Sequence, residues 1–368
     1  MSGRRDMTPA VGTPGGPASW RRAVRGAAVA LSQRRWRDAA WSDIFRRDSG
    51  YLSDAPPDPA RVAEANRRGR AQAPDVVDGP IMKAPVWTWE VPVYFWTGGM
   101  AAGASFVAMA CDLAGDARSA RLARRVVLAA LAPSPALLTM DLGRPERFHH
   151  MLRIVKPRSP MSTGAWCLTV FGALGAAAVG ADLLGRPRAA RALGATNAVV
   201  GGYLGSYAGV LLAATAVPVW ARSRLFLGPI FVSTAVLTGA AATRLTVSAA
   251  GVPAGHPTRA ALGRVESGAM AAELLLSELN RHRLGPLAAA LDDGAGARWF
   301  TAAQWLARGG LALRLLGRRL GPRAEHAASG LFMGSALCFR FAWVRAGRSS
   351  ARDDEAVART ARARRARR

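Results

Sequence analysis

The feature that most constrains this chain is a series of apolar stretches between Val91 and Trp343. Each has roughly 20 residues, the length that an α-helix needs to cross the hydrocarbon core of a bilayer. We therefore predict an all-α fold, a polytopic bundle of about eight transmembrane spans. The spans are expected at residues 92–113, 123–142, 163–185, 194–218, 227–250, 258–280, 298–318 and 326–345.

Charge gathers at the two ends of the 368-residue chain. The first 85 residues hold 15 Lys and Arg, and nine Arg follow from Arg345 onward. Basic segments beside spans face the cytoplasm, and an even number of spans puts both termini on one side. We expect a multi-pass protein of the inner (plasma) membrane with cytoplasmic termini. Cations at helix ends suit lipid headgroups, so the net charge of +26 does not indicate nucleic-acid binding.

Three domains follow from this distribution. Residues 1–85 are a basic N-terminal arm, rich in Pro, Gly and Arg and expected to be largely disordered. Within it, residues 20–45 have the pattern of an amphipathic helix, which would lie on the membrane or against a partner. The transmembrane domain covers residues 86–345, and a basic tail covers 346–368.

The sequence lacks the ligand patterns of redox metals. The three cysteines are isolated within apolar stretches, with no CxxC pair, so no iron–sulfur cluster or zinc site is expected. The five histidines lie in connections or at helix ends rather than inside spans. We therefore expect no haem and no metal in this chain.

The densest polar sequence joins the second and third stretches. It reads "MDLGRPERFHHMLRIVKPRSPMSTGAW" from Met140 to Trp166. Pro145 prevents the second helix from simply continuing, and Ser159 or Ser162 can cap the third. The simplest interpretation is that the arginines here bind headgroups while Asp141 pairs with one of them.

A second unusual sequence enters the first span as "PVWTWEVPVYFWTGGMAAGASF", residues 85–106. Its aromatic residues suit a membrane interface. Glu90 is harder to explain, because it is an acidic residue among aromatics at the membrane boundary, a setting that suits proton exchange. Gly99 and Gly103 have the spacing that allows close helix packing.

The sequences "VPVYFWTGGMAAGASF", "MDLGRPERFHHMLR" and "SPMSTGAW" together resemble the NrfD/PsrC family (polysulfide reductase NrfD-like) of quinone-interacting membrane subunits, near members that accompany formate dehydrogenases. The resemblance implies a haem-free, eight-helix anchor with no catalytic metal of its own. Its partners would be a four-cluster-type iron–sulfur subunit and a molybdopterin or tungstopterin catalytic subunit. Its cofactor would be a quinone, either menaquinone or ubiquinone, and formate oxidation is the expected reaction.

A quinone site needs an apolar slot, hydrogen-bond donors and a proton route. On the resemblance, Tyr94 and His149 are candidate donors to the quinone oxygens. Asp141 and Glu90 are candidate proton acceptors or orienting groups. The expected pocket also takes in Trp89, Gly98, Gly99, Gly103 and Trp166, with Arg144 and Arg147 organising the loop or meeting the partner.

Three charges lie deep within later spans: Arg244, Glu266 and Glu273. Charges within a bilayer usually pair or line a polar cavity. They would form either a structural pair between Arg244 and a glutamate or part of a proton path. The same residues support an alternative function, a secondary transporter with an intramembrane Arg/Glu site. A third possibility is a passive anchor with no quinone chemistry.

Overall fold

The computed structural model describes residues 81–142, 145–153, 155–293 and 296–365, with four isolated residues before them, Ala60, Ala63, Glu64 and Arg67. The chain divides into two units, Met1–Val76 and Val77–Arg368. The predicted helix at 20–45 and the candidate residue Arg144 lie outside the described residues. The described part of the second unit is helical without strands, which confirms the predicted all-α class.

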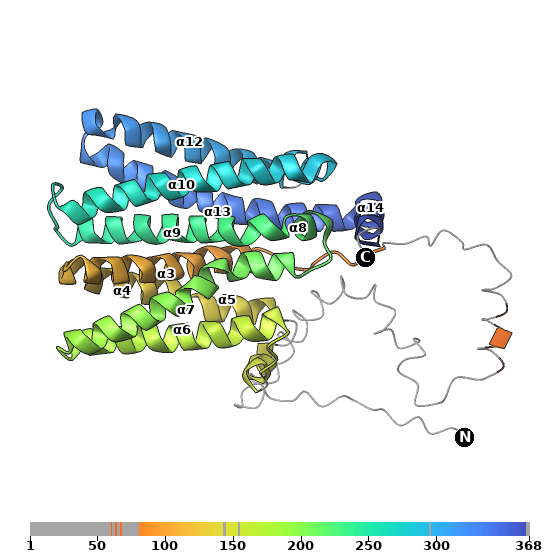
Figure 1. The fold of residues 1–368 in the computed structure, drawn as a ribbon, viewed down its shortest axis with the longest axis horizontal. Coiled ribbons are helices and arrows are strands. Elements are labelled where there is room, and N and C mark those ends of the chain that lie inside the picture. Colours follow the sequence, from red (N-terminus) through yellow and green to blue (C-terminus); the bar gives the residue numbers. More distant parts are fainter. Residues whose placement is uncertain are drawn as a thin grey trace, which may run out of the picture. The chain divides into compact units, whose positions relative to one another are not determined.

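Long helices run side by side along the second unit, joined by shorter ones (Figure 1). The long helices are α3 (Glu90–Leu113), α4 (Ala117–Leu131), α6 (Pro160–Leu183), α7 (Pro187–Ala213), α9 (Arg224–Ala249), α10 (Pro257–Leu284), α12 (Ala297–Leu320) and α13 (Pro322–Arg352). The shorter ones are α5 (Ser134–Asp141), η2 (Pro145–Leu152), α8 (Pro218–Arg222), η3 (Gly285–Ala288), α11 (Ala289–Asp292) and α14 (Asp354–Arg365).

Five helical segments of the described chain are long and apolar enough to cross a membrane. They are Glu90–Leu113, Ala117–Asp141, Pro160–Leu183, Arg224–Ala249 and Pro322–Arg352. Three more helices, α7, α10 and α12, lie where the fourth, sixth and seventh spans were expected. The membrane character of the chain is thus supported, while the count of eight spans stays a prediction.

The bundle has two unlike ends. At the short-turn end, on the left of Figure 1, consecutive helices are joined by residues 114–116, 184–186, 250–256 and 321. At the long-loop end the connections cover residues 142–159, 214–223 and 285–296. The segment before α3 and helix α14 also lie at the long-loop end. There Trp87 stacks on Trp220, and the Ile81 amide donates a hydrogen bond to Asp354 at 3.0 Å.

Local sequence explains where the helices begin and end. The Asp116 side chain caps α4 by accepting a hydrogen bond from the Ser119 amide at 3.0 Å. Ser159, one of the two predicted caps, caps α6 by accepting from the Ser162 amide at 3.4 Å. Gly115 ends the first turn with φ of 77°, a left-handed conformation that favours glycine.

The second predicted span differs from expectation. Instead of one helix over 123–142, the structure has α4 and α5, separated at Ala132 and Pro133. Pro133 and Pro135 have no backbone N–H to donate to carbonyl groups of α4. The helix is therefore interrupted after Leu131. Helix α4 begins at Ala117, before the predicted start at residue 123, so Arg124 lies inside the helix rather than at the start of the span.

Two helices far apart in sequence, α3 and α9, pack in backbone contact. A Cβ atom on Gly103 would lie 1.8 Å from the Ala235 carbonyl oxygen, and one on Gly239 would lie 2.2 Å from the Ala104 amide nitrogen. Close backbone approach of this kind is how helices associate in lipid, where the hydrophobic effect does not drive packing. The crossing joins the two halves of the bundle.

Candidate functional site

The geometry of α3 and α5 brings two predicted carboxylates to one level. These helices are antiparallel neighbours, and Thr97 Oγ1 lies 3.5 Å from Ser134 Oγ. Glu90 is seven residues before Thr97 (97 − 90), and Asp141 is seven after Ser134 (141 − 134). Seven residues of helix span about 10 Å. Both carboxylates therefore lie at the long-loop end, at a similar depth.

Glu90 is fully buried although it is the first residue of α3. The Thr88 hydroxyl donates a hydrogen bond to Glu90 Oε2. Trp89, the residue between them, is 51% exposed, so it marks the outer edge of the site. Asp141 is half-buried at the end of α5. A buried and a half-buried carboxyl group thus flank the start of α3.

Tyr94 lies one turn further along α3 and is buried. Its ring packs on Gly98, where a Cβ atom would lie 3.5 Å from Tyr94 Cε2. The same hydrophobic cluster contains Tyr207 of α7, which the sequence analysis did not select. The Tyr207 ring occupies the space beside Gly164, where a Cβ atom would lie 2.0 Å from Tyr207 Cζ. Nothing local in the sequence of α7 marks Tyr207 as a neighbour of Tyr94.

Trp166 lies six residues into α6 from the same end (166 − 160) and is half-buried. Its indole Nε1 is buried and has no hydrogen-bond acceptor among the described residues. A buried donor without a partner is costly, and it suits a ligand that carries a carbonyl oxygen. The unpaired indole is a candidate donor that the sequence analysis did not name, and the role of Trp166 as a wall of the quinone pocket stays a prediction.

The two adjacent histidines lie outside the bundle, on η2. His149 and His150 are exposed, with ring centroids 4.4 Å apart in an edge-on arrangement. Loss of hydration, together with the nearby positive charges of His149, Arg153 and Arg147, lowers the pKa of His150. The exposure of His149 leaves its imidazole accessible to a ligand or a partner.

Large apolar side chains are exposed around this end. We call them the docking rim, and they belong to the segment before α3, the end of α5, and residues 148–161. The rim comprises Ile81, Val86, Trp89, Met140, Phe148, Leu152, Val155 and Met161. Exposed apolar side chains of this size at the end of a membrane bundle suit contact with a partner protein or with lipid.

Gly99 and Gly103 face other helices. A Cβ atom on Gly99 would lie 3.5 Å from Arg340 Nη2 of α13. Gly103 faces the backbone of α9, as described above. Both glycines therefore serve helix packing, and contact of either with a quinone ring stays a prediction.

One buried charge network ties α3, α4 and α6 near the short-turn end. Arg124 pairs with Asp112 at 2.5 Å and bidentately with Asp182 at 2.6 and 2.9 Å. All three side chains are at most 10% exposed. Arg191, which is 53% exposed, lies 3.8 Å from Asp112. The sequence analysis did not select Arg124, because its partners Asp112 and Asp182 lie on other helices and no local pattern marks them.

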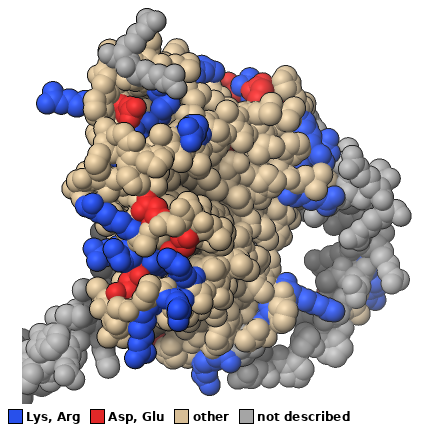
Figure 2. Space-filling model, turned by 60° about the vertical axis from the view of Figure 1, so that its left-hand side comes forward, with Lys and Arg blue, Asp and Glu red and all other residues tan. Residues whose placement is uncertain are grey.

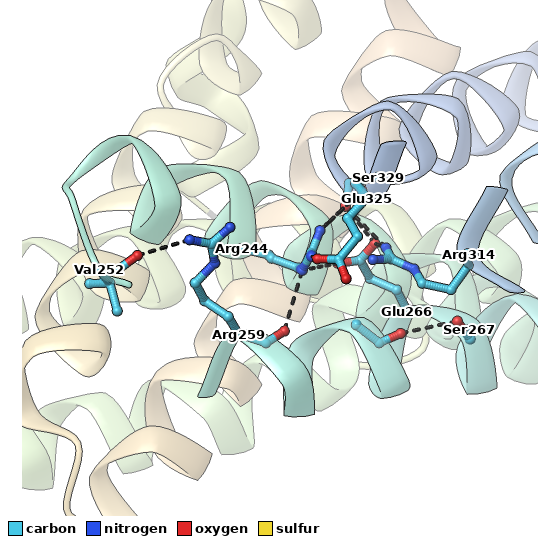
Figure 3. A network of polar contacts seen from close by, with 9 residues as sticks. Arg244, Val252, Arg259, Glu266, Ser267, Arg314, Glu325 and Ser329 are labelled. Atoms are coloured by element: carbon cyan, nitrogen blue, oxygen red, sulfur yellow. Dashed lines mark hydrogen bonds and ion pairs between the residues drawn. The ribbon is translucent and has the colours of Figure 1, made fainter. Parts of the chain in front are cut away.

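A second network ties α9, α10, α12 and α13 near the same end (Figure 3). Arg244 forms an ion pair with Glu325 and lies 4.0 Å from Glu266. Glu266 also pairs with Arg314 and accepts a hydrogen bond from Ser329 Oγ at 2.7 Å. The structure thus joins Arg244 to two glutamates. The structural interpretation accounts for these contacts, and a proton path through them stays a prediction.

Glu273 is separate from this network. It lies further along α10, is 5% exposed, and accepts a hydrogen bond from Ser277 Oγ at 2.7 Å. Arg340 of α13 is also buried, and its guanidinium lies 3.8 Å from the centre of the Phe231 ring. Arg340 donates to Thr234 Oγ1 as well. The three predicted intramembrane charges therefore belong to two sites rather than one.

The short-turn end has basic and acidic side chains side by side, as Figure 2 shows for the face that it brings forward. The rest of that face is mostly uncharged. Within the described ranges, no group of three or more His, Cys, Asp or Glu residues is placed to hold a metal ion. The predicted quinone-site residues Glu90, Tyr94 and Asp141 lie at the other end of the bundle.

Comparison with protein families gives one match, to polysulphide reductase, NrfD, over residues 80–277. The matched region has 198 residues (277 − 80 + 1), more than half of the chain, and extends from the segment before α3 into α10. A search of curated proteins found no match. The chain therefore belongs to the polysulphide reductase NrfD family, and is a quinone-interacting membrane subunit of a redox complex.

Proposed function

We propose that the chain exchanges electrons between an iron–sulfur subunit, docked on the rim at the long-loop end, and a quinone bound beside α3, α5 and α6. One observation carries the proposal: Glu90, Tyr94 and Asp141 lie at the same end of the bundle as the docking rim. A quinone site must be close to its electron donor, and here the polar groups and the interaction surface share one end.

Each side chain has a defined task in this proposal. A bound quinone takes up two electrons and two protons to become the quinol. Tyr94, His149 and the Trp166 indole donate hydrogen bonds that hold the ring oxygens. Asp141, half-buried, exchanges protons with water, and Glu90, oriented by Thr88, holds a proton behind it.

The chemistry of the rim suggests what docks there. Its apolar side chains are joined by exposed cations of the same loop: Arg147, Arg153, Lys156 and Arg158. This surface fits a partner with an apolar centre and an acidic border. We assign that partner as a four-cluster-type iron–sulfur subunit on the cytoplasmic side, which connects to a molybdopterin or tungstopterin subunit. Formate oxidation with menaquinone reduction is the proposed reaction, supported by the resemblance of the sequence.

The test is a mild-detergent purification of the tagged protein, with mass spectrometry and a quinone-reduction assay on the same eluate. We expect an iron–sulfur subunit and a molybdopterin-type subunit to be recovered. Asp141→Asn should keep the partners and lower turnover by about 100-fold or more, the usual effect of losing a proton-transferring group. Recovery of the chain alone, without bound quinone, would overturn the proposal.

Tyr203 and His150 provide matched controls for Tyr94 and His149. Tyr94→Phe and His149→Ala should lower quinone turnover, whereas Tyr203→Phe and His150→Ala should not. Tyr203 is 38% exposed and bonded to Thr163, and His150 lies beside His149 on the same surface. Equal activity in all four variants, with partners retained, would instead indicate a passive anchor.

Secondary transport through Arg244 and Glu266 is the rival function. Both side chains are engaged in ion pairs with Glu325 and Arg314. Membership of a family of redox subunits favours electron exchange. Solute uptake by the chain alone in liposomes, abolished by Arg244→Met, would favour transport.

A further inference from the structure

A cavity of about 220 Å³ lies between α10, α12 and α13, away from the site described above. It belongs to the second half of the bundle, and its position along α10 and α13 is near their middles. The residues that define it are Glu273, Ser277, Gln304, Phe300, Ser335 and Phe339. Its size suits the ring system of one small aromatic headgroup.

The polar side of this cavity accepts hydrogen bonds. Glu273 lies there, with one carboxyl oxygen bonded to Ser277 Oγ at 2.7 Å. The Ser335 hydroxyl already donates to the Ala303 carbonyl at 2.8 Å, so its oxygen is left as an acceptor. Gln304 adds a half-buried amide. A ligand with hydroxyl groups matches this set, because carboxyl and hydroxyl oxygens accept hydrogen bonds from its hydroxyl groups.

The apolar side of the cavity is an aromatic wall. The Phe300 and Phe339 rings line the cavity with centroids 6.4 Å apart and planes tilted by 36°. Leu274 and Ala303 complete the wall. Two aromatic rings set at such an angle favour edge-to-face or offset contact with a third ring.

The surroundings of the cavity indicate that the ligand arrives from lipid. Leu275, Leu279 and Trp305, on the outer faces of α10 and α12, are 62%, 49% and 66% exposed. Glu278 and Arg308 are the exposed members of the cavity lining. A phosphate headgroup would meet the Glu273 carboxyl inside, so an anionic lipid is disfavoured and an uncharged, hydroxyl-bearing headgroup is favoured.

We infer that this cavity is a second site, which binds the headgroup of a lipid-soluble quinol with a hydroxyl donating to Glu273 and the ring packed against the Phe300 and Phe339 side chains. The inference rests on the proposed function only for the identity of the ligand pool. The cavity is separate from Glu90, Tyr94 and Asp141, so the two sites can be tested independently.

The experiment uses the full chain in phosphatidylcholine nanodiscs with a menaquinol analogue that carries a diazirine on its side chain. After illumination, peptide mass spectrometry locates the cross-links. We expect one set on α10 and α12 and another on α3 and α6. Ala303→Phe, which fills the cavity, should lower the first set at least 10-fold and leave the second unchanged. Leu315→Phe, at an 83% exposed position of the same helix, is the matched control.

A second variant guards against misfolding. Gln304→Leu removes the amide while keeping similar volume, and should lower cross-linking at α10 and α12 several-fold with an unchanged gel-filtration profile. Unchanged cross-linking in both variants overturns the inference, as does native mass spectrometry showing a phospholipid that Ala303→Phe displaces. If the unmodified chain gives no cross-links on α3 and α6 but keeps those on α10 and α12, the proposed function is overturned and this inference stands.

Discussion

The short-turn end and the long-loop end of the bundle differ in how their polar and apolar side chains are arranged. At the short-turn end, two networks of buried charges join seven helices, and each acidic group described there has a cationic partner. At the long-loop end, the connections are long and expose large apolar side chains together with cations. The difference teaches that polarity in this membrane protein is not itself a sign of function. Paired charges support the fold, whereas the candidate chemistry lies beside the docking rim.

The largest expected effect on stability comes from replacing Arg124 at the short-turn end. Arg124→Met leaves Asp112 and Asp182 buried without their main partner, so we expect unfolding free energy to fall by about 3–5 kcal/mol. Thermal unfolding in detergent measures this. Arg191→Met removes only the exposed contact to Asp112 and should cost under about 0.5 kcal/mol. Equal losses in the two variants would show that the buried network does not hold this end together.

Replacing Glu325 and Asp292 in turn compares the contribution of one ion pair at each end to stability. Glu325→Gln removes the ion pair with Arg244, but the side chain is 37% exposed, so solvent screens the pair and we expect a loss of about 1–2 kcal/mol. The control is Asp292→Asn, which removes a 3.6 Å pair with Arg281 near the long-loop end. That variant should cost under about 0.5 kcal/mol in the same measurement. A larger loss of unfolding free energy for Asp292→Asn would show that ion pairing stabilises the long-loop end more than the short-turn end.

A pH titration tests the short-turn end at Asp116. Burial alone would raise the pKa of this carboxyl, but hydrogen bonds from Ser119 and Thr258 and the nearby His256 outweigh it and hold the pKa below its ordinary value. A lowered folded-state pKa contributes stability above the unfolded value, which is lost as pH falls. Asp116→Asn should therefore be less stable than the wild type at pH 7, by under about 1 kcal/mol.

That difference should shrink as the pH falls below about 4, the ordinary pKa of aspartate. The measurement is unfolding temperature against pH for both proteins. Asn at this position still caps α4, so cap loss does not confound the result. A difference that persists at low pH would show that the ionised form of Asp116 contributes nothing.

The docking rim should give the smallest effect on stability. Phe148→Ser combined with Leu152→Ser changes two exposed side chains of η2, so we expect the unfolding free energy to stay within about 0.5 kcal/mol. Recovery of the proposed iron–sulfur partner in a pull-down should nevertheless fall at least 10-fold. Leu183→Ser, 72% exposed at the short-turn end, should leave recovery unchanged. Loss of the partner in both variants would mean that the rim is not specific.

Hydropathy located the helices well because an apolar stretch of membrane length has few alternatives to a helix. It located their ends less well. The last span was expected at residues 326–345, whereas helix α13 covers Pro322–Arg352. Arg345 and Arg348 lower the local hydropathy, but arginine is compatible with a helix. Arg348 also donates to the Trp87 carbonyl at 3.1 Å, a contact that no local pattern shows.

The candidate site could be predicted only in part. The motifs around Glu90 and Asp141 marked both residues, but their common level depends on the interruption between α4 and α5. Tyr207, Arg124 and Glu325 were missed because each meets its neighbours across helices distant in sequence. Such contacts have no periodicity to read, so the sequence marks single polar residues and leaves their partners undefined.

The backbone contact between α3 and α9 has a consequence for biosynthesis. Helix α3 is made and inserted early, yet the surface that receives Gly103 and Gly239 is complete only after α9 has left the ribosome. Until α9 is inserted, the face of α3 that carries Gly103 has no partner at this crossing. Final closure of the bundle is a late event, which makes truncated chains that end before α9 natural substrates for membrane quality control.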